Sequence, residues 1–136
     1  MWMIDTLVMI NWMKRRQNPI RMLEPFFRAG RLVSCGVIRV EVLRGMTKPE
    51  ARTEFEAFFD LIPEVPLTST LWKHVAAVAW SLDRKGEVLA LPDLIIGVSA
   101  IQANAELITQ DAHFLKIPGL RTRRDLPGIN TLTTGH

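Results

Sequence analysis

Four carboxylates in this sequence stand among apolar residues, where a charge is costly unless something offsets it. Asp5 lies in MIDTLV, Glu41 in RVEVL, Asp93 in LPDLII and Asp111 in LITQDAHF. The remaining acids lie on polar helix faces, in turns, beside prolines or at a strand start, where solvent or a basic neighbour explains them. Any one of the four, taken alone, is equally well explained as a helix cap or a salt-bridge partner. The four together are the candidate functional residues.

Carboxylates gathered in one place need a counter-charge. Two of them about 4 Å apart repel by ~4 kcal/mol at an effective dielectric of about 20, a large part of a small domain's stability. Protonation of one or two acids would relieve the repulsion, as would an arginine such as Arg39, but a divalent cation is the most economical answer. Oxygen ligands favour Mg²⁺, with Mn²⁺ second, and the lack of a Cys/His cluster disfavours zinc. Such a cation supports phosphodiester hydrolysis.

The elements that must position these acids are short segments separated by proline and glycine turn signals. Strands are predicted over 1–4, 31–37, 64–67 and 105–109, with a candidate fifth over 120–122. Helices are predicted over 6–16, 19–29, 48–62, 68–86 and 92–104, and a helical turn over 112–116. Pro25 must kink the second helix or restart it. The strand over 31–37 leads into a short segment that ends at Gly45. Strands separated by helices predict an α/β fold, with a central parallel sheet of four to five strands and helices on both faces.

This arrangement places the four acids near one edge of the sheet. Asp5 and Asp111 follow the carboxyl ends of two predicted strands, and Asp93 lies in the first turn of a buried helix. Glu41, on the segment after the second strand, can reach the same edge. Because ligands of open α/β sheets bind at the carboxyl ends of the strands, this edge is the predicted site.

Length and composition predict one domain over residues 1–136, with 48% hydrophobic residues to form its core. The single cysteine, Cys35, cannot form an internal disulfide, which favours a cytoplasmic protein. The apolar N-terminus is broken by Asp5 and is too short for a signal peptide or a membrane helix. The net charge of +3 reflects 17 basic residues against 14 acidic ones, and the basic residues concentrate at 14–16 and 121–124. A solvated face and phosphate binding explain these clusters equally well.

Four stretches, MIDTLVMINWM, VIRVEVLRG, LPDLIIGVSAI and LITQDAHFLKIPGL, in this order and at these separations, resemble the PIN-domain ribonucleases. The resemblance is closest to the VapC toxins of type II VapBC toxin–antitoxin systems, and it runs from Met1 to about Arg121. It implies a three-layer α/β/α sandwich and Mg²⁺- or Mn²⁺-dependent endonucleolytic cleavage of RNA. It also implies a homodimer and a cognate VapB-like antitoxin that wraps and inhibits the toxin.

Carried across residue by residue, the resemblance assigns the functional roles. It makes four acids catalytic: Asp5, Glu41, Asp93 and Asp111. Three of them, Asp5, Asp93 and Asp111, are implied to bind the metal. The hydroxyl of Thr6 is implied to support the metal shell. Arg44 and His113 are candidate RNA contacts because of their charge and their positions near the acids.

The sequence departs from the family pattern close to the acids. Leu7 stands where many members carry Ser or Asn, and Ile38 stands where many carry Ser or Thr. The last acid lacks the further acid or Asn that often follows it, so the number of metal ions stays open. The alternative is a catalytically weak or inactive PIN-like module that binds RNA or protein. Aspartyl-phosphate chemistry is excluded, because it needs a second Asp at the position of Leu7.

Overall fold

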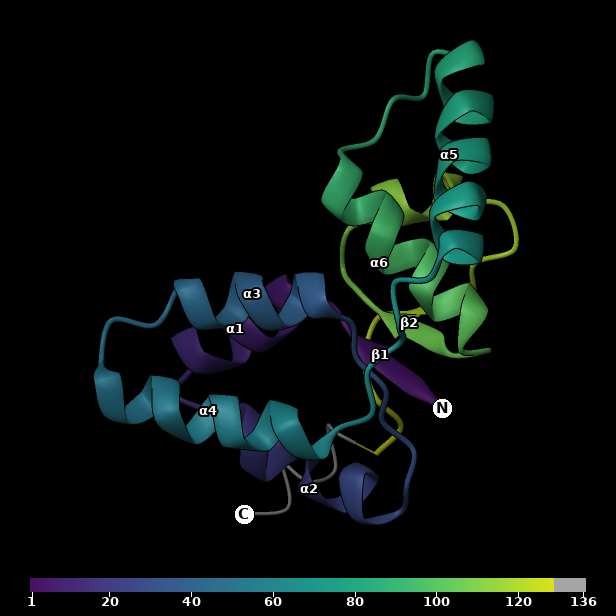
Figure 1. Cartoon of the computed structure of the whole chain (residues 1–136). Helices are drawn as coiled ribbons and strands as arrows, with labels where there is room; N and C mark the ends of the chain where they lie inside the picture. The colour runs from purple at the N-terminus through teal and green to yellow at the C-terminus, as the bar shows by residue number, and fades with distance from the viewer. Residues whose placement is uncertain (129–136) are drawn as a thin grey trace.

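The computed structural model describes residues 1–128 of the chain, which form short strands and helices (Figure 1). The elements in chain order are β1 (Trp2–Ile4), α1 (Thr6–Lys14), α2 (Pro19–Arg28), α3 (Gly36–Arg44), α4 (Pro49–Leu61), α5 (Ser69–Arg84), α6 (Leu91–Gln102), β2 (Glu106–Ile108), the 3₁₀ helix η1 (Ala112–Lys116) and β3 (Thr122–Arg123). The α/β class predicted from the sequence is confirmed.

The described part of the chain has a parallel sheet of three strands in the order β1-β2-β3. In the β1–β2 ladder Ile4 pairs with Ile108, and in the β2–β3 ladder Ile108 pairs with Arg123. Beyond β1, two isolated parallel bridges continue the layer, one from Trp2 to Leu32 and one from Ser34 to Glu64. The predicted parallel layer is present, but two of its predicted strands are reduced to isolated bridges.

The prediction of four to five strands is therefore wrong for residues 1–128. Segment 31–37 ends early because Cys35 already caps α3, which begins at Gly36. Segment 64–67 follows Pro63 and contains Pro66, and a proline has no N–H to donate to a ladder. A short apolar run does not distinguish a buried strand from the buried start of a helix. The last strand, predicted over 120–122, lies at Thr122–Arg123.

The predicted helices begin and end within about two residues of the observed ones. The segment before Gly45, predicted as a short connection, is the helix α3. Pro25 does not restart α2, which continues from Pro19 to Arg28. In Figure 1, α1, α3 and α4 lie together on one side of the strands and α5 and α6 on the other. None of the helices in residues 1–128 is long and apolar enough to cross a membrane.

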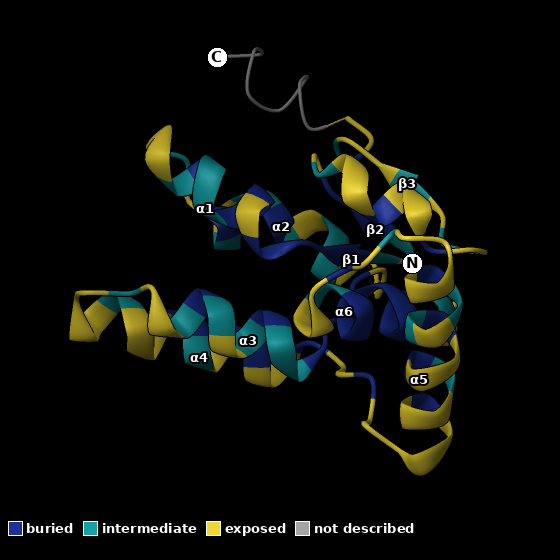
Figure 2. Ribbon diagram, turned by 90° about the horizontal axis from the view of Figure 1, so that it is seen from above, coloured by how far each residue is buried: buried dark blue, intermediate teal, exposed yellow. Residues whose placement is uncertain are grey.

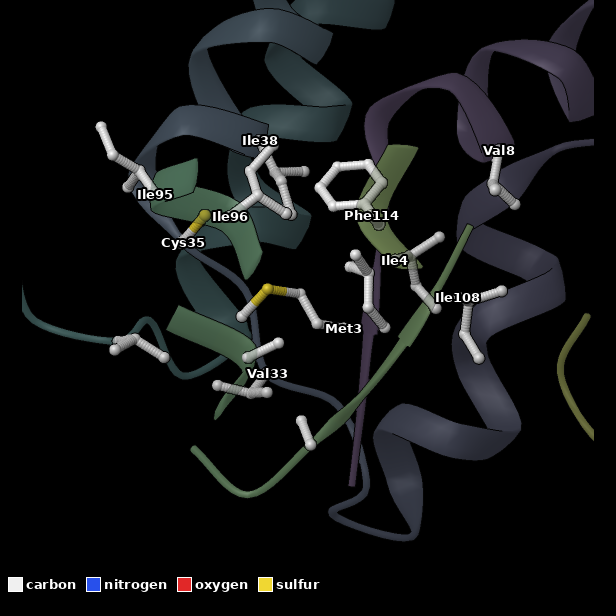
Figure 3. Packing of buried hydrophobic residues seen from close by; sticks show 14 of the residues in the cluster. Met3, Ile4, Val8, Val33, Cys35, Ile38, Ile95, Ile96, Ile108 and Phe114 are labelled. Carbon is white, nitrogen blue, oxygen red and sulfur yellow. The ribbon is translucent and has the colours of Figure 1, made fainter. Parts of the chain in front are cut away.

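The core lies where the sheet meets α3, α6 and η1. Helix α6 is buried over most of its length, and α5 covers it with an exposed outer face (Figure 2). Figure 3 shows side chains from these elements in contact with the strands, among them Met3, Ile38, Ile96 and Phe114, which are all at most 1% exposed. This packing holds the carboxyl ends of β1 and β2 beside α3 and α6.

Candidate active site

The four predicted acids come from four separate elements. Asp5 directly follows β1 and its backbone N–H donates to the carbonyl of Ile108, 2.9 Å away, so it sits at the carboxyl edge of the sheet. Asp111 lies just beyond β2, Asp93 in the first turn of α6 and Glu41 on α3. The placement at the carboxyl edge of the sheet is as predicted.

All four acids line one pocket of about 420 Å³. The pocket is also lined by the apolar side chains of Leu7 and Ile10 from α1, the hydroxyl of Thr6 and the guanidinium of Arg44. The structure thus brings together residues that lie far apart in the sequence. Of the two candidate RNA contacts, Arg44 lines this pocket. His113 does not line it, but its ring nitrogen Nδ1 contacts the carboxylate of Asp111, which does.

Asp5 is the most deeply buried of the four acids, at 5% exposed. Its pKa is raised from 3.8 to about 6, chiefly because burial disfavours the charged form. A hydrogen bond from Thr109 and the backbone N–H of Thr6 act in the opposite direction, while the charges of Asp93 and Glu41 raise the pKa further. The pocket therefore holds more negative charge than its surroundings stabilise.

Asp93 has a raised pKa for the same reasons. Burial contributes most, followed by the negative charges of Asp111 and Glu41, whereas His113 lowers the pKa. Carboxylates whose pKa values are raised by burial and by neighbouring negative charges are typical of functional sites.

Two threonine hydroxyls hold the carboxylates in place. Thr6 Oγ1 donates to Glu41 Oε1 at 2.7 Å, so α1 and α3 are joined inside the pocket. Thr109 Oγ1 donates to Asp5 Oδ2 at 2.9 Å and accepts from the backbone N–H of Asp111 at 3.1 Å. Thr109 therefore links two of the acids directly.

Thr109 was missed by the sequence analysis, although a signal for it existed. It directly follows β2 as Asp5 follows β1, and Ile4 pairs with Ile108 in the parallel ladder. The next residues along the two strands, Asp5 and Thr109, are therefore neighbours. A hydroxyl two residues before a candidate acid, at the end of an apolar strand, is the pattern that predicts such a contact.

No lysine or arginine within residues 1–128 forms a salt bridge with Asp5, Glu41 or Asp93. The suggested arginine, Arg39, instead pairs with Asp60 at 2.8 Å and Glu64 at 2.6 Å, so it does not offset the charge of the pocket. The remaining ways to offset that charge are protonation and a bound cation.

Asp111 does have local partners. Its Oδ1 accepts from the backbone N–H of His113 at 2.9 Å, which caps η1, and lies 2.8 Å from His113 Nδ1. The helix-cap explanation thus holds in part for Asp111. It does not hold for Asp5, whose side chain makes no capping hydrogen bond to α1.

The chemistry of this donor set fits a Mg²⁺ or Mn²⁺ ion, because every candidate ligand is a carboxylate oxygen. In the part of the chain that the structure describes, however, no three His, Cys, Asp or Glu side chains already stand close enough to coordinate one ion. Binding would therefore need the carboxylates to turn toward one another, or water molecules to complete the coordination shell.

Several solved structures share this fold. The VapBC2 complex from Rickettsia felis, bound to a DNA fragment from its promoter, contains a chain with a TM-score of 0.73 and 20% identity. The DNA-bound VapBC of Salmonella typhimurium has a TM-score of 0.73 and 23% sequence identity. VapBC-1 of nontypeable Haemophilus influenzae has a TM-score of 0.70 and 24% sequence identity. Each alignment covers 90% of this chain and 96% of the other. At these identities the likeness shows the fold.

No curated protein sequence matches the chain. The profile of the PIN domain family matches residues 2–120, a span that contains all four acids and every element up to η1. The match agrees with the fold of the solved structures and with the predicted resemblance. The chain belongs to the PIN domain family.

Proposed function

We propose that this protein is a metal-dependent endoribonuclease of the VapC type, a toxin that hydrolyses RNA phosphodiester bonds and is neutralised by a cognate antitoxin. One observation carries the proposal: four carboxylates from separate elements line one pocket and, within residues 1–128, three of them lack a cationic side chain as partner. Membership of the PIN domain family, whose members are in general nucleases, supports it.

In this proposal Asp5, Asp93 and Asp111 hold Mg²⁺, with Mn²⁺ as a substitute. The ion supplies a bound water of lowered pKa and positive charge near the phosphoryl oxygens. Thr109 holds the Asp5 carboxylate at the pocket wall by the 2.9 Å hydrogen bond to Oδ2.

Two further pairs complete the proposed site. Thr6 holds Glu41 through the 2.7 Å hydrogen bond. This bond keeps the Glu41 carboxylate, the fourth proposed catalytic residue, at the pocket wall. Arg44 lies in the pocket and contacts a phosphate of the RNA. His113, which is 65% exposed in its side chain and is held by Asp111, is the second RNA contact.

The test is cleavage of cellular or synthetic RNA by the purified protein with Mg²⁺. Asp93→Asn keeps the size of the side chain and removes its charge, and we expect cleavage to fall on the order of 100-fold or more. Asp83→Asn is the matched control, because Asp83 is an exposed acid on α5 outside the pocket. Full activity of Asp93→Asn, or of the unmodified protein with a chelator, refutes the metal assignment.

The partners are part of the same proposal. The solved VapBC complexes with this fold support a VapB-like antitoxin as the partner. A homodimer, which the resemblance to the VapC toxins implies, is the other proposed assembly. Growth arrest on expression of the free chain in the cytoplasm, relieved by co-expression of the protein encoded upstream, tests this part. Unimpaired growth despite full-length expression contradicts the toxin role.

A PIN-like module that binds RNA or protein without cutting is the second candidate. Leu7, at 54% exposed, places an apolar side chain at the pocket, and no preformed three-ligand group is present in residues 1–128. Binding of an oligoribonucleotide with no cleavage in Mg²⁺ or Mn²⁺ would favour this candidate over the nuclease.

A further inference from the structure

A second pocket adjoins the acidic one, and two arginines lie in its lining. Its volume is about 230 Å³, and it is lined by Thr109, Gln110, Asp111, Ala112, Leu115, Thr122, Arg123 and Arg124. Asp111 lines both pockets, and Thr109 in the second pocket donates to Asp5 in the first. The two pockets are therefore neighbours along the carboxyl edge of the sheet.

The C-terminal arginines differ in how far they are already engaged. Arg121 donates to the carbonyl oxygen of Asn104 at 3.0 Å and to its side-chain oxygen at 3.2 Å, so it has a structural role. Arg123 reaches Glu106 only at 3.4 Å, longer than an ordinary hydrogen bond. Arg124 is exposed and has no hydrogen-bond or salt-bridge partner within residues 1–128. Within residues 1–128, the guanidinium of Arg124 is thus available to bind a ligand, and that of Arg123 is only partly engaged by Glu106.

A pocket with two arginines beside the acidic one suits a phosphate that flanks the bond at the acids. In the proposed nuclease the acidic pocket would take the phosphate that is attacked, whereas a flanking phosphate needs a cationic donor from the protein itself. Arginine suits this role because its planar guanidinium binds phosphate oxygens in pairs. A pocket of about 230 Å³ would hold several waters of roughly 30 Å³ each, and so has room for a phosphate.

We propose that this second pocket binds a backbone phosphate of the RNA strand, next to the bond at the acidic pocket, with Arg124 as its main contact and Arg123 as its second. The inference rests on the proposed nuclease function and adds where the strand runs. Leu115, 69% exposed at the same pocket, provides an apolar surface for a sugar or an unpaired base.

The test measures binding without cleavage. A fluorescently labelled single-stranded oligoribonucleotide is titrated with the protein in a chelator, at several salt concentrations, and its anisotropy is followed. Arg124→Gln removes one phosphate contact, so we expect roughly tenfold weaker binding at low salt. The slope of log Kobs against log salt should become shallower by about 0.7. Arg124→Glu should weaken binding further.

Arg52→Gln is the matched control, since Arg52 is an exposed arginine on α4, which contributes no residue to either pocket. Its binding and salt slope should equal those of the unmodified protein. Equal binding by Arg124→Gln and the unmodified protein, or no binding by either, overturns the phosphate pocket. Binding that depends on Arg124, with no cleavage in any metal, upholds the pocket and refutes the nuclease proposal instead.

Discussion

At the scale of single residues, Asp5 is the group whose charge the fold tolerates least. It is 5% exposed, it has Asp93 and Glu41 as negative neighbours, and its hydrogen bond from Thr109 only partly offsets these effects. In a protein without bound metal, Asp5 therefore keeps its proton to a higher pH than an ordinary aspartate. This property can be measured without any assay of activity.

We predict a specific pH dependence of stability for the metal-free protein. The pKa of Asp5 is 3.8 ordinarily and about 6 when folded, so between these values the folded state binds more protons than the unfolded chain. The contribution of Asp5 to the free energy of unfolding then falls as the pH rises from about 4 to about 6. Relative to the unmodified protein, Asp5→Asn should gain on the order of 3 kcal/mol over this range.

Urea denaturation in a chelator, at intervals from about pH 4 to about pH 8, gives this difference. Asp83→Asn is again the control, because Asp83 is an exposed acid on α5 outside the pocket. A stability difference between Asp5→Asn and the unmodified protein that stays constant with pH would contradict the raised pKa.

At the scale of elements, the close approach of α6 to the segment after η1 sets the spacing of two acids. Asp93 lies at the start of α6 and Asp111 directly before η1. A Cβ atom placed on Gly97 of α6 would lie 2.4 Å from Ile117 Cδ1 and 3.4 Å from Leu120 Cδ2. The glycine therefore allows the two elements to pack at this distance.

We predict that Gly97→Ala destabilises the protein by roughly 1 kcal/mol. Overpacking against Ile117, which is 2% exposed, costs about 1–3 kcal/mol, and the better helix propensity of alanine recovers up to about 1 kcal/mol. Thermal and urea denaturation measure the change. Gly36→Ala is the control, because a Cβ atom there has no other atom within 4 Å.

A double-mutant cycle separates the clash from other effects. Ile117→Val removes the Cδ1 atom, so its cost should be smaller in the Gly97→Ala background than in the unmodified protein. Additive costs would mean that the α6 contact does not limit the packing at Gly97.

Apart from α3, the helices were predicted better than the strands, because each of these helices carries its signal within its own sequence. The stripe of Phe55, Phe58 and Phe59 predicts α4, and the start of α4 is marked by Pro49. A strand of two or three residues has too few positions for a period, and its partner lies elsewhere in the chain. Segments 31–37 and 64–67, which form only isolated bridges, were therefore predicted as full strands from their apolar residues alone.

At the scale of the whole molecule, a metal ion would join elements that the chain keeps far apart. The ligands proposed here follow β1, begin α6 and precede η1, so bound metal favours the folded state in which they meet. Unfolding would separate them, and the site would be lost together with the fold.

We therefore predict that Mg²⁺ raises the melting temperature of the protein. At a concentration of about ten times Kd, the ion adds about 1.4 kcal/mol to the free energy of unfolding, which corresponds to a shift of several degrees. Differential scanning fluorimetry with MgCl₂, against NaCl of equal ionic strength, measures the shift. Asp5→Asn should lose most of it, and an equal shift in both proteins would show that Mg²⁺ binds elsewhere.

The sequence by itself determined which residues to suspect. Hydropathy singled out four acids in apolar stretches, the turn signals gave the order of the elements, and the resemblance supplied the family, which the profile match over residues 2–120 confirms. These are local properties or matches along the chain, so they need no knowledge of which segments touch. The catalytic and metal-binding roles of the acids stay proposals.

Only the tertiary structure decided how these residues meet. The hydrogen bond from Thr109 to Asp5 joins residues 104 positions apart, and Arg39 turned out to pair with Asp60 and Glu64. Of the C-terminal arginines, Arg123 and Arg124 line a pocket beside the acids, whereas Arg121 binds Asn104. Hydrogen bonds, ion pairs and pockets depend on distances through space, and packing sets those distances only once the distant segments have folded together.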